Sequence, residues 1–160
     1  MPPRQSLPAP RASVAWHRWF PIQYRLIRLL DPLVRRWWLA AGLGNVIELR
    51  VVGRRTGKPR PVLLGLLRAG DRWFLGHPNG DVAWTRNLEA AGSAELVFRS
   101  PAGIPIHATR LDHGELRDQA IAATGQHVFP GNLIYRLARA HIRAVGTYFL
   151  VEREADERAG

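Results

Sequence analysis

One eight-residue segment combines four cations with two glycines and a hydroxyl group. Residues 53–60 read Gly-Arg-Arg-Thr-Gly-Lys-Pro-Arg, and they lie between two apolar runs that predict β-strands. Glycine lets backbone amides converge on an anion, arginine binds phosphate or carboxylate oxygens with paired hydrogen bonds, and lysine adds a movable charge. The order of these residues is not that of a Walker loop. The segment predicts an anion-binding loop, and the alternative is a solvated basic turn without a ligand.

A second segment, residues 77–88, joins a predicted strand to a predicted helix through an Asn-Gly turn. The free amides at the start of such a helix attract negative groups. Trp84 and Asn87 are three residues apart and share one helix face, where they offer a flat apolar surface and an amide. This pair suits a ring that carries carbonyl groups. The alternative is a core Trp84 with Asn87 as its surface neighbour, and His77 either bonds the ligand or caps the strand.

The composition excludes several other chemistries. The chain of 160 residues contains no cysteine, which rules out disulfides, thiolate metal sites, iron–sulfur clusters and a cysteine nucleophile. Its six histidines show none of the spacings typical of metal ligands, so no metal site is predicted. No Gly-x-Ser-x-Gly elbow occurs. Any redox chemistry must therefore come from a bound cofactor.

The charge is large and unevenly distributed. The formal net charge is +10, and Lys58 is the only lysine among the 23 basic residues. Counted from the sequence, residues 1–50 carry +6, residues 51–110 carry +5 and the remainder carries −1. Such a balance indicates an anionic partner that meets the first two-thirds of the chain.

The elements that must position these segments follow from the hydrophobic periodicity. Two pairs of strands are expected to form antiparallel hairpins, and Asp81 and Gly92 are expected to begin and end the helix that carries Trp84. The sequence predicts an α+β fold, a small antiparallel β-barrel with peripheral helices. The predicted strands are 46–52, 60–67 paired with 72–76, 94–99 paired with 104–111, and 147–152; the predicted helices are 81–91, 115–124 and 132–144.

The chain divides into four predicted regions. A flexible lead (1–12) precedes amphipathic helices (13–44), a barrel domain (45–154) and a tail (155–160). The tryptophans and arginines of the helical region suit packing over the barrel mouth or against a second subunit of a homodimer. They also suit peripheral contact with an anionic membrane. No apolar run is long enough to cross a membrane and no signal peptide is evident, so we expect a cytoplasmic protein with membrane association left open.

Taken together, the two chemical segments resemble the deazaflavin-dependent nitroreductase family, whose members are FMN-binding-like split β-barrels. The likeness lies in the Gly-Arg-Arg-Thr-Gly-Lys-Pro-Arg block, an apolar strand, a hairpin, and Trp-x-x-Asn-Leu followed by Glu-Ala-Ala-Gly and a strand. It extends over about residues 45–151. The resemblance implies reduced coenzyme F420 as hydride donor, a deazaflavin with a ribityl phosphate and a polyanionic oligoglutamate tail.

The resemblance also implies which residues hold each part of this cofactor. The phosphate and tail carboxylates would be held by Arg54, Arg55, Lys58 and Arg60, with Thr56 and Gly57 as loop donors. The ring would be bordered by Pro61, Val62, Leu63, Ala83, Trp84 and Asn87, beside a turn that contains His77, Asn79 and Gly80. Tyr135 is the candidate proton donor for reduction of a small, lipophilic electrophile such as an enone, nitro compound or quinone.

The leading hypothesis is thus an F420-dependent oxidoreductase, with FMN as the alternative cofactor. A second hypothesis is a non-catalytic split barrel that binds a flavin, haem or lipid. A third is a basic nucleic-acid-binding module, which is not favoured because no helix-turn-helix, zinc-finger or RNA-recognition signature occurs.

Overall fold

The computed structural model describes residues 45–98, 102–127 and 130–154. The predicted lead, N-terminal helices and tail lie outside the described residues. The membrane contact assigned to the N-terminal helices therefore stays a prediction. Within the described segments, no helix is long and apolar enough to cross a membrane.

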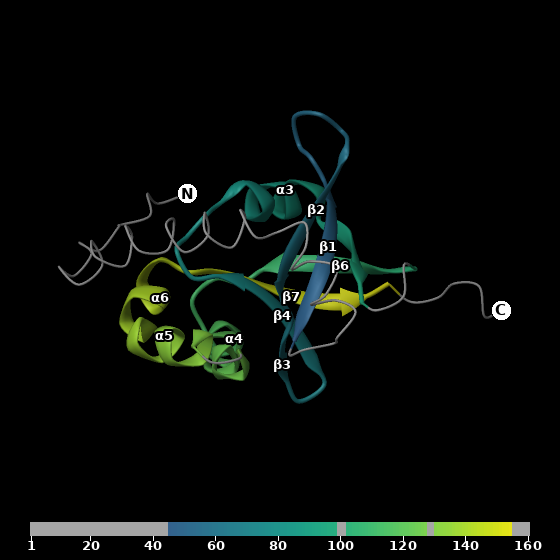
Figure 1. Cartoon of the computed structure of the whole chain (residues 1–160). Helices are drawn as coiled ribbons and strands as arrows, with labels where there is room; N and C mark the ends of the chain where they lie inside the picture. Colours follow the sequence, from purple (N-terminus) through teal and green to yellow (C-terminus); the bar gives the residue numbers. More distant parts are fainter. Residues whose placement is uncertain (1–44, 99–101, 128–129, 155–160) are drawn as a thin grey trace.

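Seven antiparallel strands form one curled sheet in the order β2-β1-β5-β6-β7-β4-β3 (Figure 1). The two edge strands, β2 and β3, are consecutive in the chain, so the sheet bends round into a half-barrel. The predicted α+β split-barrel class is confirmed. The strands are β1 (Val46–Val52), β2 (Pro59–Gly65), β3 (Leu67–Ala69), β4 (Arg72–His77), β5 (Ser93–Val97), β6 (Gly103–Arg110) and β7 (Thr147–Arg153).

The sheet separates two hydrophobic cores. On β1 the side chains alternate, with Ile47, Leu49 and Val51 buried inside the barrel. The outer face of β3, β4 and β7 packs against a helical layer, where Phe74 and Tyr148 lie in the second core. The helices of this layer, grouped at one side of the sheet in Figure 1, are α4 (Glu115–Ala123), η1 (Thr124–Gln126), α5 (Gly131–Leu137) and α6 (Arg139–Val145).

Tyr148 explains one glycine in this sheet. Its ring lies over Gly76 of the neighbouring strand β4, where a Cβ atom would come within 2.3 Å of the ring. Strand β4 therefore needs a residue without a side chain there.

Two sequence predictions about the elements are wrong in extent. The apolar run 60–67 was expected to form one strand that pairs with 72–76. Instead the strand is interrupted at Leu66, so that β2 pairs with β1 and only β3 pairs with β4. Two hydrogen bonds hold Leu66 at this interruption: the side chain of Asn45 donates to the Leu66 carbonyl, and the Leu66 amide donates to the Asn45 carbonyl. The predicted helix 132–144 is divided in two at Ala138.

Candidate anion-binding site

The basic segment forms a closed turn at the end of the β1–β2 hairpin. The Gly53 amide donates to the Lys58 carbonyl at 2.9 Å, and the amides of Thr56 and Gly57 donate to the Gly53 carbonyl at 3.1 and 2.8 Å. Gly57 has a φ of 63°, in the left-handed region that favours glycine. A Cβ at Gly53 would lie 2.8 Å from the Thr56 hydroxyl, so both glycines are required by the shape of the turn.

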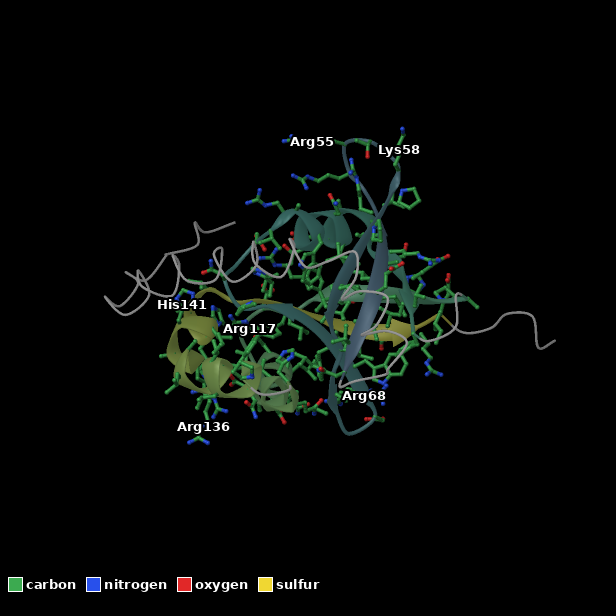
Figure 2. All side chains as sticks on the ribbon, viewed as in Figure 1. Arg55, Lys58, Arg68, Arg117, Arg136 and His141 are labelled. Carbon is green, nitrogen blue, oxygen red and sulfur yellow. The ribbon has the colours of Figure 1, made fainter. Side chains whose placement is uncertain are left out.

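The cations of this turn are exposed and carry no counter-charge. Arg54, Arg55, Lys58 and Arg60 are exposed, and none forms an ion pair with residues in the described part of the chain. Figure 2 shows Arg55 and Lys58 at the tip of the turn, where they point away from the body of the protein and to opposite sides. The turn therefore presents positive charge that is available to an anion from solvent.

Helix α3 (Ala83–Ala91) supplies the second part of the site. Its first turn contains no acidic residue. The predicted cap, Asp81, does not begin the helix. The capping residue is Val82, whose amide donates to the Thr85 hydroxyl and whose carbonyl accepts from it, both at 2.9 Å. Gly92 ends the helix as predicted, with φ 67° and its amide bonded to Leu88.

The structure joins the loop to α3 through Asn87. The Asn87 side-chain oxygen accepts from the Arg54 amide at 3.3 Å and from Arg54 Nη1 at 3.0 Å. Asn87 itself is only 9% exposed. The two segments that the sequence analysis selected separately thus meet in space, 33 residues apart in the chain.

Arg86 is a cation near the site that the sequence analysis missed. It directly precedes Asn87 on α3, is exposed, and forms no ion pair within the described segments. Its positive charge acts on the turn at residues 77–81, because it helps to lower the pKa of Asp81. Successive helix residues lie about 100° apart, so a helix that buries Trp84 and Asn87 on one side turns Arg86 to the other side, and that spacing could have found Arg86.

Trp84 lies in the barrel core and does not offer an exposed ring. It is 6% exposed and packs against His77 and Phe149, with ring centroids 6.5 and 6.2 Å away. Its indole Nε1 is buried and has no hydrogen-bond partner among the described residues. The core alternative for Trp84 fits this geometry.

The turn at residues 77–81 is occupied by internal contacts. His77 Nδ1 lies 3.2 Å from the Gly80 carbonyl and 3.3 Å from the Asn79 amide, and the Asn79 side-chain oxygen accepts from His141 Nε2 at 3.0 Å. Burial lowers the pKa of His77 to about 4, against the opposing influence of Gly80 and Asp81. His77 is thus neutral at pH 7. Ligand contacts of His77, Asn79 and Gly80 stay predictions, which these internal contacts do not favour.

Asp81 ties this turn to two strands. It accepts from the Thr147 hydroxyl at 2.8 Å and lies 3.0 Å from Arg110 Nη1, which also contacts Glu89 at 2.7 Å. Burial raises the pKa of Asp81, but the bonds from Thr147 and Arg110 outweigh it and hold this pKa below its usual value. The network fixes the entry to α3 against β6 and β7.

The remaining predicted residues lie on β2, at the start of α3 and on α5. Val62 packs on the barrel core, while Pro61 is exposed and Leu63 is half-buried; Ala83 is exposed at the start of α3. Tyr135, on α5, stacks on His127 at 4.5 Å. A Cβ at Gly65 would lie 2.5 Å from the His127 ring, which places this pair at the opposite end of β2 from the loop.

Tyr135 therefore does not join the site. A seven-residue strand is about 20 Å long, and β2 separates the loop from the His127–Tyr135 pair by that length. Its role as proton donor stays a prediction that this separation does not favour. In the described segments, no group of three or more His, Asp or Glu side chains is placed to hold a metal ion.

The comparisons with known proteins identify the fold. No family model matches the sequence, and no curated protein matches it. Among solved structures, HutZ, the haem storage protein from Vibrio cholerae, aligns with a TM-score of 0.55 and 15% identity over 78% of this chain and 90% of that chain. A domain-swapped dimer aligns with a TM-score of 0.51 and 17% identity, over 82% and 96% of the two chains.

An F420-H2 dependent reductase, FDR-A, aligns with 20% identity over 68% of this chain and 94% of that chain. Its TM-score is 0.49. At these identities the likeness is one of fold: the chain is a split β-barrel of the architecture that HutZ also has.

Proposed function

We propose that the chain is an F420-dependent reductase that binds the anionic part of the deazaflavin at the β1–β2 loop and α3. The observation that carries this proposal is the junction of the loop with α3 through Arg54 and Asn87. It sets the exposed cations of the loop beside the middle of α3. A phosphate with a chain of carboxylates is the kind of ligand that such a surface binds.

One feature of the chain fits this cofactor directly. Arg55, Lys58 and Arg60 lack ion-pair partners among the described residues, so they keep their charge for the phosphate and tail. A ligand with several anionic groups can pair with all three cations.

When bound, the deazaflavin would supply a hydride to an electrophilic acceptor. The residues of this chain bind and orient it: Lys58 and Arg60 hold anionic oxygens, and Pro61 and Leu63 along β2 offer apolar surface towards the ring. The barrel core behind Val62 excludes water from that side. Positioning of this kind is the main contribution that a protein makes to hydride transfer from a cofactor.

Titration tests the proposal directly. Purified full-length protein is titrated with F420, FMN and haem, and oxidation of reduced F420 is then followed with a panel of enones, nitroaromatics and quinones. We expect micromolar F420 binding and turnover with at least one acceptor class. F420 binding without turnover across the panel supports only the non-catalytic alternative. Failure to bind F420, with FMN or haem bound instead, contradicts the proposal.

A homodimer is also proposed, because the split barrel with TM-score 0.51 is a domain-swapped dimer. Sedimentation of the full-length protein, with and without F420, tests it. A monomer in both conditions would contradict the dimer and leave the cofactor proposal standing.

A further inference from the structure

Arg54 differs from the other cations of the loop. Two of its donors, the backbone amide and Nη1, bond to one oxygen of Asn87, at 3.3 and 3.0 Å. For Arg55, Lys58 and Arg60 the described residues provide no side-chain hydrogen bond or ion pair to the charged group. The loop therefore contains one cation committed to the protein and three that face solvent.

Asn87 is built to act as a rigid partner. It lies on α3 with only 9% of its surface exposed, between the buried residues Thr85 and Leu88. The helix is held in turn by the Asp81 network with Arg110 and Thr147. The Asn87 oxygen is therefore a fixed acceptor for Arg54, and it limits the positions that the start of the loop can take. The bond from the charged guanidinium is stronger than a hydrogen bond between neutral groups.

The remainder of the loop depends on the same residue. Gly53, which precedes Arg54, accepts from the amides of Thr56 and Gly57 and donates to Lys58. The Arg54 bonds fix the orientation of the peptide unit between Gly53 and Arg54, and this unit carries the acceptor for two loop amides. A change at Asn87 would thus reach Lys58 without any contact between the two side chains.

We propose that Asn87 is a positioning residue, which locks the loop through Arg54 so that Arg55 and Lys58 are preorganised for an anion beside Arg60 of β2. This role deepens the proposed function. It rests on that function in one respect, because it requires that the loop binds an anion. It assigns Asn87 a role different from contact with the cofactor ring. A preorganised site avoids the entropy of ordering its loop on binding.

The test uses full-length protein, with inorganic pyrophosphate as the probe at low salt, and solvent exchange of the Arg54, Thr56 and Gly57 amides measured by NMR. Asn87→Leu removes the acceptor at similar volume. We expect pyrophosphate affinity to fall about tenfold, as loss of a charge-assisted hydrogen bond implies, and these amides to exchange faster. Affinity within twofold of the wild type overturns the proposal.

The conservative variant separates position from charge. Asn87→Asp keeps an oxygen acceptor for both Arg54 donors, so the loop amides should exchange as slowly as in the wild type, whereas the added negative charge should weaken pyrophosphate binding. Equally fast exchange in Asn87→Asp and Asn87→Leu overturns the proposal. Arg136→Ala is the matched control: this exposed arginine of α5 lies far from Arg55 and Lys58 in Figure 2, and its loss should change neither readout.

A loop-side variant covers the case in which Asn87→Leu does not fold. Arg54 is exposed, so Arg54→Ala keeps the fold and removes the guanidinium half of the lock. Faster exchange at Thr56 and Gly57 supports the proposal, and unchanged exchange overturns it. Because pyrophosphate is the probe, these outcomes stand whether or not the protein binds F420. Loss of F420 binding alone would contradict only the proposed function.

Discussion

Two turns contact α3 or lead into it, and they use their polar residues in opposite ways. The β1–β2 loop at residues 53–60 holds exposed arginines and a lysine without ion-pair partners in the described segments. The turn at residues 77–81 holds His77, Asn79 and Asp81, each of which contacts a protein group. Both turns contain a glycine with positive φ, Gly57 at 63° and Gly80 at 78°.

The difference follows from solvation. An exposed charge stays hydrated, so leaving it without a partner costs the fold little, whereas a buried polar group without a partner costs free energy. The turn at 77–81 begins at the buried His77 and is half-buried at Asn79 and Gly80, and its contacts hold α3. The loop is exposed, and its charges contribute little to folding. We infer that the loop serves a ligand and the turn serves the fold.

The largest expected effect is acid destabilisation through the turn. The pKa of His77 is lowered by burial to about 4 from 6.5, so the folded protein keeps it neutral while the unfolded chain protonates it. Stability is then full above pH 6.5 and is lost as the pH falls towards 4, by roughly 3 kcal/mol. Urea unfolding at several pH values measures this slope, to which His127, also with a lowered pKa, adds.

The His77→Gln variant isolates the contribution of His77. It cannot titrate, so its stability should fall less steeply with acid than that of the wild type. His107→Gln, at an exposed histidine on β6, is the control for loss of a histidine. Identical slopes for His77→Gln and the wild type would show that the buried turn is not the acid-sensitive element.

The next largest effect concerns the loop. The double variant Lys58→Ala with Arg60→Ala removes two exposed charges and should weaken F420 binding on the order of 100-fold, since each charged hydrogen bond contributes about 1.5–3 kcal/mol. Its thermal midpoint should match that of the wild type. Isothermal titration and a thermal melt measure the two quantities. Unchanged affinity would mean that the anion binds elsewhere.

An intermediate effect tests the turn by the same two measurements. Thr147→Val removes the hydroxyl that donates to Asp81 at 2.8 Å and keeps the shape of the side chain. Stability should fall by about 1 kcal/mol while F420 affinity stays within twofold of the wild type. If this variant lost F420 affinity as well as stability, the conclusion that the turn serves the fold and the loop serves the ligand would be contradicted.

The smallest expected effect is that of Arg86. Arg86→Ala removes an exposed charge next to Asn87 on α3 and should weaken F420 binding about threefold, with a smaller dependence on salt. Arg136→Ala removes the same charge on α5 and should leave binding unchanged. Equal effects of the two variants would indicate a response to net charge rather than a localised site.

Much of the fold could be predicted from the sequence, because the pattern that predicts it is local. Alternating apolar residues in β1, the turn residues before β6, and the glycine after α3 act over a few positions, and the corresponding elements were found within a few residues. The predicted pairing of 60–67 with 72–76 failed because the bonds from Asn45 to Leu66 determine where β2 ends. No local pattern reveals a partner 21 residues away.

In the candidate site, too, some features follow from local sequence and others follow only from the tertiary structure. Residue types and spacing determined by themselves that residues 53–60 form an exposed basic turn, because charge, glycine and an apolar flank on each side are properties of the segment. Only the tertiary structure decided which polar residues remain for a ligand. Asn87 bonds Arg54, Asn79 bonds His141, and Tyr135 lies at the other end of β2. Hydrogen bonds between distant segments depend on how the barrel closes, and this closure brings partners together that no spacing along the chain encodes.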